Sequence, residues 1–321
     1  MSAAAALFLL LAVLQGCAYF SREANIVYMK VDALFSARDI EIEINTSFLE
    51  KYKNKVTITA TFTVDKAMQN PIGRSLDGDL HFAGRAPEIA LPLVGEIANA
   101  ASEKPAIDLV HSVEGTGRSL KVSGAWRIWP EHPGSAPEDQ GMPLAPMDSK
   151  SPDHVFEIHP ITRINNLEIL DTFRPVEGFL PGNAHSTFEI FQGTECRLTA
   201  EPGKVKIVTR KGLYNDVEFL LEVADSRQIE VPDGRFVFAS AMDLDGNLLV
   251  KQLRMVFVRD TPPEKAVRLL KKGARLHVFG LPRLDFEEIS RRVKGSQKDP
   301  ALLLKSLPYE IMIIGVYKDA K

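Results

Sequence analysis

Residues 120–127 read Leu-Lys-Val-Ser-Gly-Ala-Trp-Arg, and residues 276–283 read Leu-His-Val-Phe-Gly-Leu-Pro-Arg. Each of these Leu-x-Val-x-Gly segments is followed, after a loop, by an aromatic-Glu-Ile segment, namely Phe156-Glu-Ile-His-Pro160 and Tyr309-Glu-Ile-Met-Ile313. The β-branched and aromatic residues in these segments are typical of strands. The same pair of strands in each half of the chain predicts a duplicated domain.

The rest of the chain also has the pattern of a β protein. Val56-Thr-Ile-Thr-Ala-Thr-Phe-Thr-Val64 alternates threonine with apolar residues, which is typical of a half-buried antiparallel strand. Helical patterns are limited to short segments at about 47–53 and at 262–272. The other predicted strands are 26–31 and 40–44 in the lead-in, 80–84, 89–97, 106–113, 119–129 and 154–164 in the first half, and 205–209, 217–224, 235–242, 248–258, 275–283 and 309–317 in the second. We expect a mainly β protein with few short helices.

Five strands, with a helix or an irregular segment between the third and the fourth, resemble the OB-fold, a small Greek-key barrel. The glycine of the Val-x-Gly strand resembles the one that permits the bend needed to close such a barrel. The resemblance implies two tandem OB-like antiparallel barrels. We predict the first at residues 55–165 and the second at 166–321, after a tether and lead-in at 18–54.

The N-terminus carries an unbroken apolar run, Leu7–Leu14, that ends in Leu14-Gln15-Gly16-Cys17. The run is too short to cross a bilayer and has the length of a signal-peptide core. Its end resembles the lipobox of bacterial lipoproteins, in which the cysteine is lipidated. The resemblance implies a signal peptide at 1–17 and a lipid anchor on Cys17. Because Ala18 is not the aspartate that retains such proteins in the inner membrane, it also implies the periplasmic side of the outer membrane. Secretion, or a buried N-terminal helix with a chance cysteine, is the alternative.

Composition limits the partners of the chain. It has 321 residues, 45% of them apolar, and a formal net charge of −3. A protein that binds nucleic acid through phosphates would normally carry a basic surface, and no strong signature of one is present. The only cysteines are Cys17 and Cys196, so lipidation of the first leaves no disulfide framework. The predicted partners are the membrane, through the lipid anchor, and an envelope protein, polymer or small ligand.

Two polar signatures occur in the first half only, Asp77-Gly78-Asp79-Leu80-His81 and Glu157-Ile158-His159-Pro160. In each of them two ionisable side chains lie two residues apart on a predicted strand, and therefore on one face of a sheet. The second half keeps Glu310 at the position of Glu157 but has Met312 in place of His159. Together the signatures resemble a group of secreted bacterial proteins that carry both on an OB-like barrel, which implies the fold and no particular activity.

Imidazole and carboxylate groups on neighbouring strands suit Zn, Mn, Fe or Ni, so a divalent metal is one predicted cofactor. A metal-free network is the alternative: Asp77-Gly78 would form a hairpin turn, and buried histidines would pair with glutamates. The candidate ligands are Asp79, His81, Glu157 and His159, with Asp77, Glu96, Glu131 and His132 as outer or alternative ligands.

The predicted function is a lipid-anchored periplasmic binding or interaction protein that uses this cluster. The alternative is a metal-dependent hydrolase, because the Asp-Gly-Asp turn resembles the acidic turn of staphylococcal-type nucleases, in which aspartates hold calcium. Metal-held water and an adjacent glutamate would then attack a phosphodiester. The Asp-Thr-Pro-Glu segment of that family is absent here. A Pro- and Gly-rich stretch at 130–152 is predicted to be a binding loop or a mobile decoration.

Overall fold

The computed structural model describes residues 39–73, 75–132, 138–141, 144–295, 301–304 and 306–318. The predicted signal peptide, the lipidation site Cys17 and the tether lie outside the described residues. From Ile40 onward the chain forms one unit. Among the helices of the described part, none is long and apolar enough to cross a membrane.

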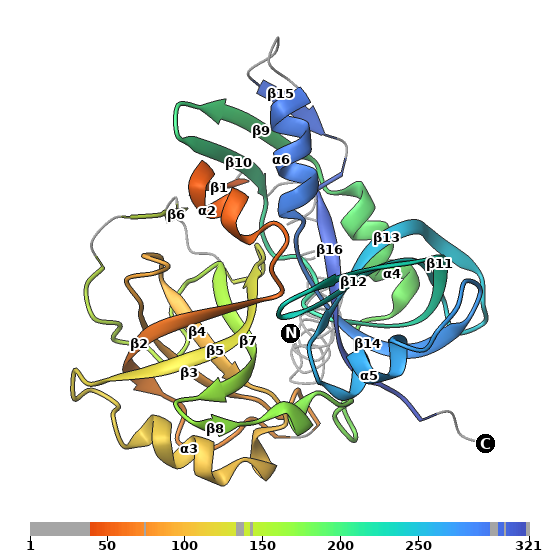
Figure 1. The fold of residues 1–321 in the computed structure, drawn as a ribbon. Coiled ribbons are helices and arrows are strands. Elements are labelled where there is room, and N and C mark those ends of the chain that lie inside the picture. Colours follow the sequence, from red (N-terminus) through yellow and green to blue (C-terminus); the bar gives the residue numbers. More distant parts are fainter. Residues whose placement is uncertain are drawn as a thin grey trace, which may run out of the picture. The chain divides into compact units, whose positions relative to one another are not determined.

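The first barrel consists of five strands that close in the order β2-β3-β4-β7-β5 (Figure 1). The pairing of β4 with β7 is parallel, and the other four pairings are antiparallel. A short helix, α3 (Lys104–His111), follows the third strand. The strands are β2 (Thr57–Ala67), β3 (Leu80–Arg85), β4 (Leu93–Ile97), β5 (Ser119–Ile128) and β7 (Phe156–Ile164), and β8 (Leu167–Glu168) extends β7 at the edge.

The second barrel repeats this topology with strands in the order β11-β12-β13-β16-β14. Its third and fifth strands, β13 and β16, again pair in parallel, and α5 (Pro262–Val267) again follows the third strand. The strands are β11 (Val217–Val231), β12 (Gly234–Met242), β13 (Leu248–Val258), β14 (Arg275–Leu284) and β16 (Tyr309–Val316). The prediction of a mainly β protein with two OB-like barrels is therefore confirmed.

The glycine of the repeated Leu-x-Val-x-Gly segment lies at a close approach of two strands in both barrels. A Cβ on Gly124 would lie 2.6 Å from the Ile158 side chain, and one on Gly280 would lie 2.5 Å from the Ile311 side chain. The β5–β7 register shifts at Gly124, and the β14–β16 register shifts at Gly280. Only glycine leaves room for this irregularity, which agrees with the role predicted for it in closing the barrel.

One predicted strand is wrong, and another exists but lies in a different sheet from the one expected. Residues 106–113 were expected to form a strand, but they lie mostly in α3, which begins next to Pro105 and buries Ala106 and Val110 on one face. The four-residue spacing of these two side chains suits a helix, and proline is favoured in a first helical turn. The strand predicted at 205–209 exists as β10 (Lys204–Arg210), but it is not part of the second barrel.

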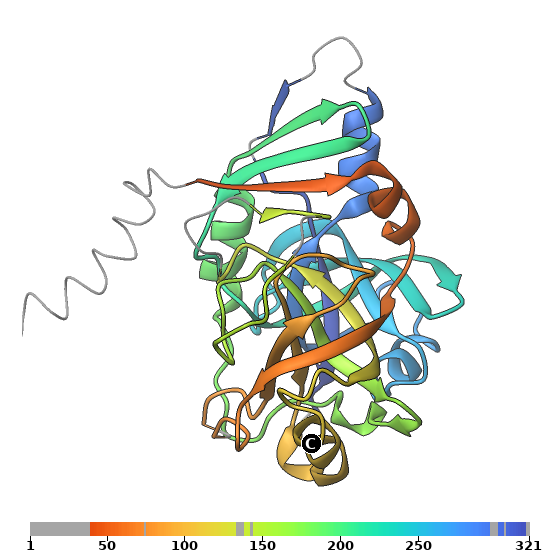
Figure 2. The same cartoon turned by 90° about the vertical axis from the view of Figure 1, so that its left-hand side faces the viewer.

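Instead, β10 belongs to a third sheet that the sequence did not predict, in the order β15-β9-β10-β1-β6. Figure 2 shows the hairpin of β9 (Cys196–Glu201) and β10 with β1 (Asp39–Asn45) beside it. The edge strands are β6 (Glu138–Asp139), from the loop predicted at 130–152, and β15 (Ala301–Leu304). The remaining elements are α2 (Thr46–Tyr52), η1 (Ala100–Ser102), η2 (Leu170–Thr172), α4 (Ala184–Gly193) and α6 (Phe286–Gly295).

The fourth strands of the two barrels, β5 and β14, exchange equivalent hydrogen bonds. Arg127 donates from Nε to the carbonyl oxygen of Pro282 at 2.8 Å, and Arg283 donates from Nη1 to the carbonyl oxygen of Trp126 at 3.0 Å. The repeat aligns Arg127 with Arg283 and Trp126 with Pro282, so the two bonds run between matching positions in opposite directions. The two barrels therefore contact each other through a local pseudo-two-fold arrangement.

Candidate metal centre

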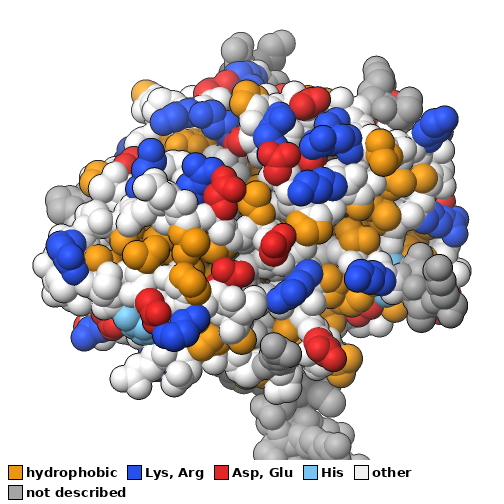
Figure 3. All heavy atoms as spheres, turned by 60° about the horizontal axis from the view of Figure 1, so that its bottom comes forward, with side chains coloured by type: hydrophobic (Ala, Val, Ile, Leu, Met, Phe, Trp, Pro, Cys, Tyr) orange, Lys and Arg blue, Asp and Glu red, His pale blue; other side chains and the backbone are white. Residues whose placement is uncertain are grey.

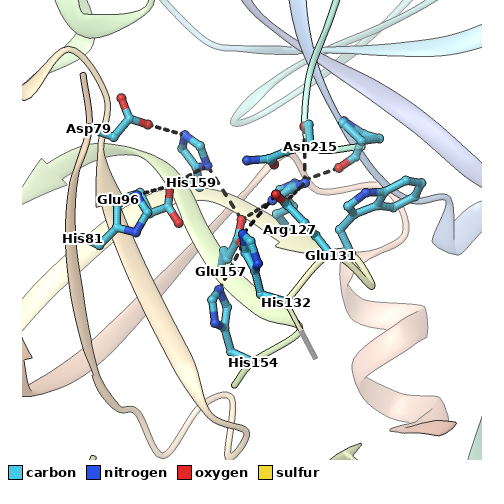
Figure 4. A network of polar contacts seen from close by, with 12 residues as sticks. Asp79, His81, Glu96, Arg127, Glu131, His132, His154, Glu157, His159 and Asn215 are labelled. Carbon is cyan, nitrogen blue, oxygen red and sulfur yellow. Dashed lines mark hydrogen bonds and ion pairs between the residues drawn. The ribbon is translucent and has the colours of Figure 1, made fainter. Parts of the chain in front are cut away.

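The polar side chains of the first barrel lie on its outer face. His81 stands opposite Glu96 in the β3–β4 register, and their neighbours Leu80, Phe82 and Ile97 belong to the apolar core. Because side chains alternate along a strand, His81 and Glu96 point away from that core. The same alternation directs two side chains of β7 outward, those of Glu157 and His159, because Phe156 and Ile158 belong to the core. Figure 4 shows these side chains converging.

Asp79, Glu96 and His159 come closest to a metal-binding arrangement. One ligand atom from each of the three lies within 4.8 Å of the other two. His159 Nε2 is 3.0 Å from Asp79 Oδ2, and His159 Nδ1 is 3.1 Å from Glu96 Oε2. Ligands bound about 2.1 Å from one ion lie about 3 to 4 Å apart. A histidine offers one nitrogen to a given ion, so the His159 ring or one of the carboxylates would have to shift for the three groups to share an ion.

The imidazole nitrogens in this group have contacts but no hydrogen bonds. Neither ring nitrogen of His159 makes a hydrogen bond of acceptable geometry, although both lie close to carboxylate oxygens, and the same holds for His81 Nε2, 3.4 Å from Glu96 Oε2. Buried polar atoms are normally hydrogen-bonded, so an exception needs a cause. The imidazole of His159 lies between two carboxylates, with a different ring nitrogen toward each of them.

Burial and charge shift the titration of this group. Burial raises the pKa of Asp79 to about 6, and the neighbouring His159 opposes that rise. Burial acts to lower the pKa of His159, but the carboxylates of Glu96 and Asp79 outweigh it and hold that pKa well above its ordinary value. Without an ion, His159 is therefore favoured as an imidazolium between two carboxyl groups.

Arg127 organises the other half of the cluster. Its fully buried guanidinium contacts Glu157 through Nη1 and lies 3.4 Å from Glu131 through Nη2. His154 Nε2 is 3.1 Å from Glu157 Oε1, and the exposed His132 pairs with Glu131 at 3.0 Å. Burial acts to raise the pKa of Glu157, but Arg127 and His154 hold it well below its ordinary range.

A second group of three possible ligands shares Glu96 with the first and adds His154 and Glu157. His154 Nδ1 lies 2.7 Å from the carbonyl oxygen of Pro152, which can orient the ring with Nε2 toward Glu157. Because the guanidinium of Arg127 already pairs with Glu157, this group is less suited to a cation than the first.

The structure thus brings together Asp79, His81, Glu157 and His159, the four ligands named from sequence, and adds Glu96 as a central member. Asp77 instead accepts the backbone N–H of Asp79 through Oδ1 at 3.1 Å, as expected of the turn alternative. Glu131 lies beside Arg127, and His132 pairs with Glu131 at the edge of the cluster. Sequence reasoning did not name Arg127 or His154 as members. The repeat contained a signal for Arg127, because an arginine and a glutamate recur in both copies.

That recurring pair shows which residues of the two barrels are equivalent. Arg127 stands opposite Glu157 in the β5–β7 ladder, and Arg283 stands opposite Glu310 in the β14–β16 ladder. The second pair is also buried, with Arg283 Nε 2.7 Å from Glu310 Oε1. The arginine–glutamate pair therefore belongs to both barrels, and the rest of the cluster does not.

The strand registers identify what the second barrel has in place of the metal-binding group. Gly95 pairs with Ile158 and Met255 pairs with Ile311, so Glu96 corresponds to Val256. In the second barrel Gly234, Phe236, Val256 and Met312 stand at the positions of Asp79, His81, Glu96 and His159. The last three of these belong to a buried apolar cluster that includes Ala125 of the first barrel. Apolar residues are thus sufficient to bury this face of a barrel.

Comparison with protein-family models and with curated proteins finds no match to this chain. The chemistry of the site therefore rests on the residues themselves. Buried aspartate, glutamate and histidine groups that could hold a metal ion are present on the first barrel.

Proposed function

We propose that the chain is a lipid-anchored binding protein of the bacterial envelope whose first barrel holds one divalent transition-metal ion. The ligands are Asp79, Glu96 and His159, and His81 lies against Glu96, with its Nε2 3.4 Å from Glu96 Oε2. A mixed set of imidazole and carboxylate donors suits Zn²⁺, Mn²⁺, Fe²⁺ or Ni²⁺ better than Ca²⁺ or Mg²⁺, which prefer oxygen donors alone.

One observation carries the proposal: three buried ionisable groups converge, and the ring nitrogens of the histidine among them make no hydrogen bond, at positions where the second barrel has Gly234, Val256 and Met312. Burying charged groups costs free energy unless they are paired or bind an ion, and apolar replacements are often as stable or more stable. Because the second barrel shows such a replacement, stability alone does not account for the polar version.

Charge also supports an ion at this place. The buried carboxylates of Asp79, Glu96 and Glu157 face one guanidinium, that of Arg127. A divalent ion with neutral imidazole ligands would bring the sum of these formal charges to zero. Histidine binds metals in its neutral form, so the two requirements are compatible.

The surroundings favour a binding role over hydrolysis. Asp79, Glu96 and His159 are each at most 5% exposed, and the cavity that touches Asp79 and His159 has a volume of only about 20 Å³. A space of that size holds about one water molecule, not a phosphodiester. The face in Figure 3 carries basic, acidic and apolar side chains side by side.

Metal analysis of the purified protein, produced without an affinity tag, tests the proposal. We expect one equivalent of metal per chain and, after stripping with a chelator, a cobalt(II) absorption spectrum that reports nitrogen and oxygen ligands. His159→Met copies the second barrel and should weaken Co²⁺ affinity at least 100-fold. His185→Met changes an exposed histidine on α4 and serves as the matched control, with unchanged affinity.

The outcomes separate the alternatives. If the parent protein binds no stoichiometric metal from any of the four ions, the metal site is refuted. If, in addition, His159→Met changes stability without metal, the cluster is a structural ion network. Metal binding accompanied by phosphodiesterase activity that His159→Met abolishes would favour the hydrolase.

The lipid anchor is tested separately, because it depends only on the segment that ends at Cys17. Cells that express the full chain with labelled palmitate should yield labelled protein in the membrane fraction. Cys17→Ser should lose the label, whereas Cys196→Ser should keep it. Label retained by Cys17→Ser would refute the anchor without affecting the metal site.

A further inference from the structure

An open cavity of about 280 Å³ lies next to the candidate metal centre. Its walls come from the turn before β3, the segment around η1 and the linker between the barrels, and its lining residues are Gly78, Asn99, Ala101, Arg174, Pro175 and Glu177. This volume is near the lower end of the range for small-molecule sites.

The open cavity adjoins the small cavity that touches Asp79 and His159. Both are lined by Asn99 and Arg174, and the small cavity has Asp77 and Asp216 among its other lining residues. Asn99 holds the linker against the first barrel, because its Nδ2 donates to the carbonyl oxygens of Thr172 at 2.8 Å and Arg174 at 2.9 Å. The linker thus forms a wall shared by the open cavity and the buried site.

We infer that the divalent ion reaches Asp79 and His159 from solvent through this open cavity, and that Arg174 opposes its passage. This inference rests on the proposed function. The small cavity is the size of one water molecule or one ion, and His159, whose ring nitrogens make no hydrogen bond, is one of its lining residues. The charged lining beyond the ligands is mainly acidic, from Asp77, Asp216 and Glu177, and Arg174 is the one Lys or Arg in either lining.

The effect of Arg174 can be estimated from the size of the cavity. A volume of about 280 Å³ corresponds to a diameter of about 8 Å. At about 8 Å in a water-like dielectric, a unit positive charge lowers the local concentration of a divalent cation about six-fold. Arg174→Ala should therefore speed Co²⁺ loading about six-fold at low salt, and the gain should shrink at high salt.

The test measures rates rather than affinity. Co²⁺ uptake by the stripped full-length protein and Co²⁺ removal by EDTA are followed by absorbance after rapid mixing. Ala101→Phe places a ring at the open cavity and should slow both rates at least ten-fold, while the ratio of the two rates, and so the Kd, stays within two-fold. Ala145→Phe adds the same ring at an exposed alanine outside both cavity linings and should leave both rates unchanged.

Each outcome decides the inference. Unchanged rates in Ala101→Phe would show that the ion takes another path, and would overturn the inference while the metal site stands. Slower loading with a weakened Kd would show damage to the site instead of a blocked route, and would also overturn it. If the parent protein binds none of Zn²⁺, Mn²⁺, Fe²⁺, Ni²⁺ and Co²⁺, the proposed function fails and the inference fails with it.

Discussion

Replacing Arg283 by methionine should destabilise the protein by about 3 to 5 kcal/mol. The guanidinium is fully buried and lies 3.8 Å from the centre of the Trp126 ring. It pairs with Glu310 at 2.7 Å and donates to the carbonyl oxygens of Trp126 at 3.0 Å, Val56 at 3.1 Å and Lys55 at 3.3 Å. Its removal leaves the buried carboxylate of Glu310 with one partner fewer and three carbonyl oxygens without this donor. Breaking a buried ion pair typically costs about 3 to 5 kcal/mol.

The assay is urea unfolding followed by tryptophan fluorescence. Trp126 and Trp129 are the only tryptophans, and both are buried. With an m value of about 3 kcal/mol/M, a loss of 4 kcal/mol lowers the midpoint by about 1.3 M. The double variant with Glu310→Met removes both charges of the pair, so it should cost clearly less than the sum of the single variants.

Additivity of the two single variants within about 0.5 kcal/mol would refute this reasoning, because two residues that do not interact behave in that way. A loss below about 1 kcal/mol in Arg283→Met alone would refute it as well. A suitable control is Arg163→Met, which removes an exposed arginine from an ion pair with Glu168. Exposed pairs contribute about 0 to 1 kcal/mol, so the control should shift the midpoint only slightly.

Three further predictions concern pH, packing and the metal. Burial raises the pKa of Asp285 to about 7, so the contribution of this carboxyl group to stability is full below about pH 4 and is lost as the pH rises through about 7. In urea melts, the free energy of unfolding of Asp285→Asn should therefore rise relative to that of the parent by up to about 4 kcal/mol between pH 4 and pH 8. A difference that stays constant with pH would contradict this. Gly84→Ala would place a Cβ 2.0 Å from the carbonyl oxygen of Thr63 and should cost about 3 kcal/mol or more, whereas Gly73→Ala meets only a contact of 3.8 Å and should cost little in the same melts. EDTA should lower the Tm of metal-loaded protein by about 5 to 10 °C in scanning calorimetry, because an ion at 100 times its Kd adds about 2.7 kcal/mol to the free energy of unfolding. EDTA should leave the Tm of His159→Met unchanged.

The barrels could be predicted from sequence because their signals are local. The threonine alternation of 56–64 fixes which side chains face the core, and Ile58, Ala60, Phe62 and Val64 do lie there. Two of the hydroxyl groups on the opposite face pair with β5, namely Thr59 Oγ1 with Ser123 Oγ at 2.8 Å and Thr63 Oγ1 with Ser119 Oγ at 2.9 Å. The repeated glycine gave a second local signal, because its absent side chain is needed where the strands approach.

The third sheet could not be predicted in the same way. It joins β1 at the start of the described chain to β9 and β10, about 155 residues later, and to β15 near the end. No turn connects β1 to β10, so nothing local in the sequence marks their pairing. The N-terminal lead-in was consequently expected to stand apart, whereas β1 shares a sheet with residues assigned to the second barrel.

The candidate site was predictable in part for the same reason. Two ionisable residues at a spacing of two share a face wherever their strand lies, so the pairs Asp79 with His81 and Glu157 with His159 could be named. Their meeting with Glu96 depends on the β3–β4 register, which the sequence does not state. Residues assigned only an outer role from sequence can therefore become central when strands pair.

The position of the site links ion binding to the contact between the barrels. Asp79 Oδ1 accepts the backbone N–H of Asn99 at 3.2 Å, and the side chain of Asn99 holds the linker through two carbonyl oxygens. An ion held by Asp79 would thus stabilise the turn that fixes the linker, while Arg127, beside Glu157, contacts the second barrel through Pro282. The second barrel secures the corresponding face with apolar side chains and needs no ligand for it. If the ion binds as proposed, its binding affects the contact between the barrels through the first barrel only. The first barrel then responds to the ligand, whereas the second barrel has a structural role.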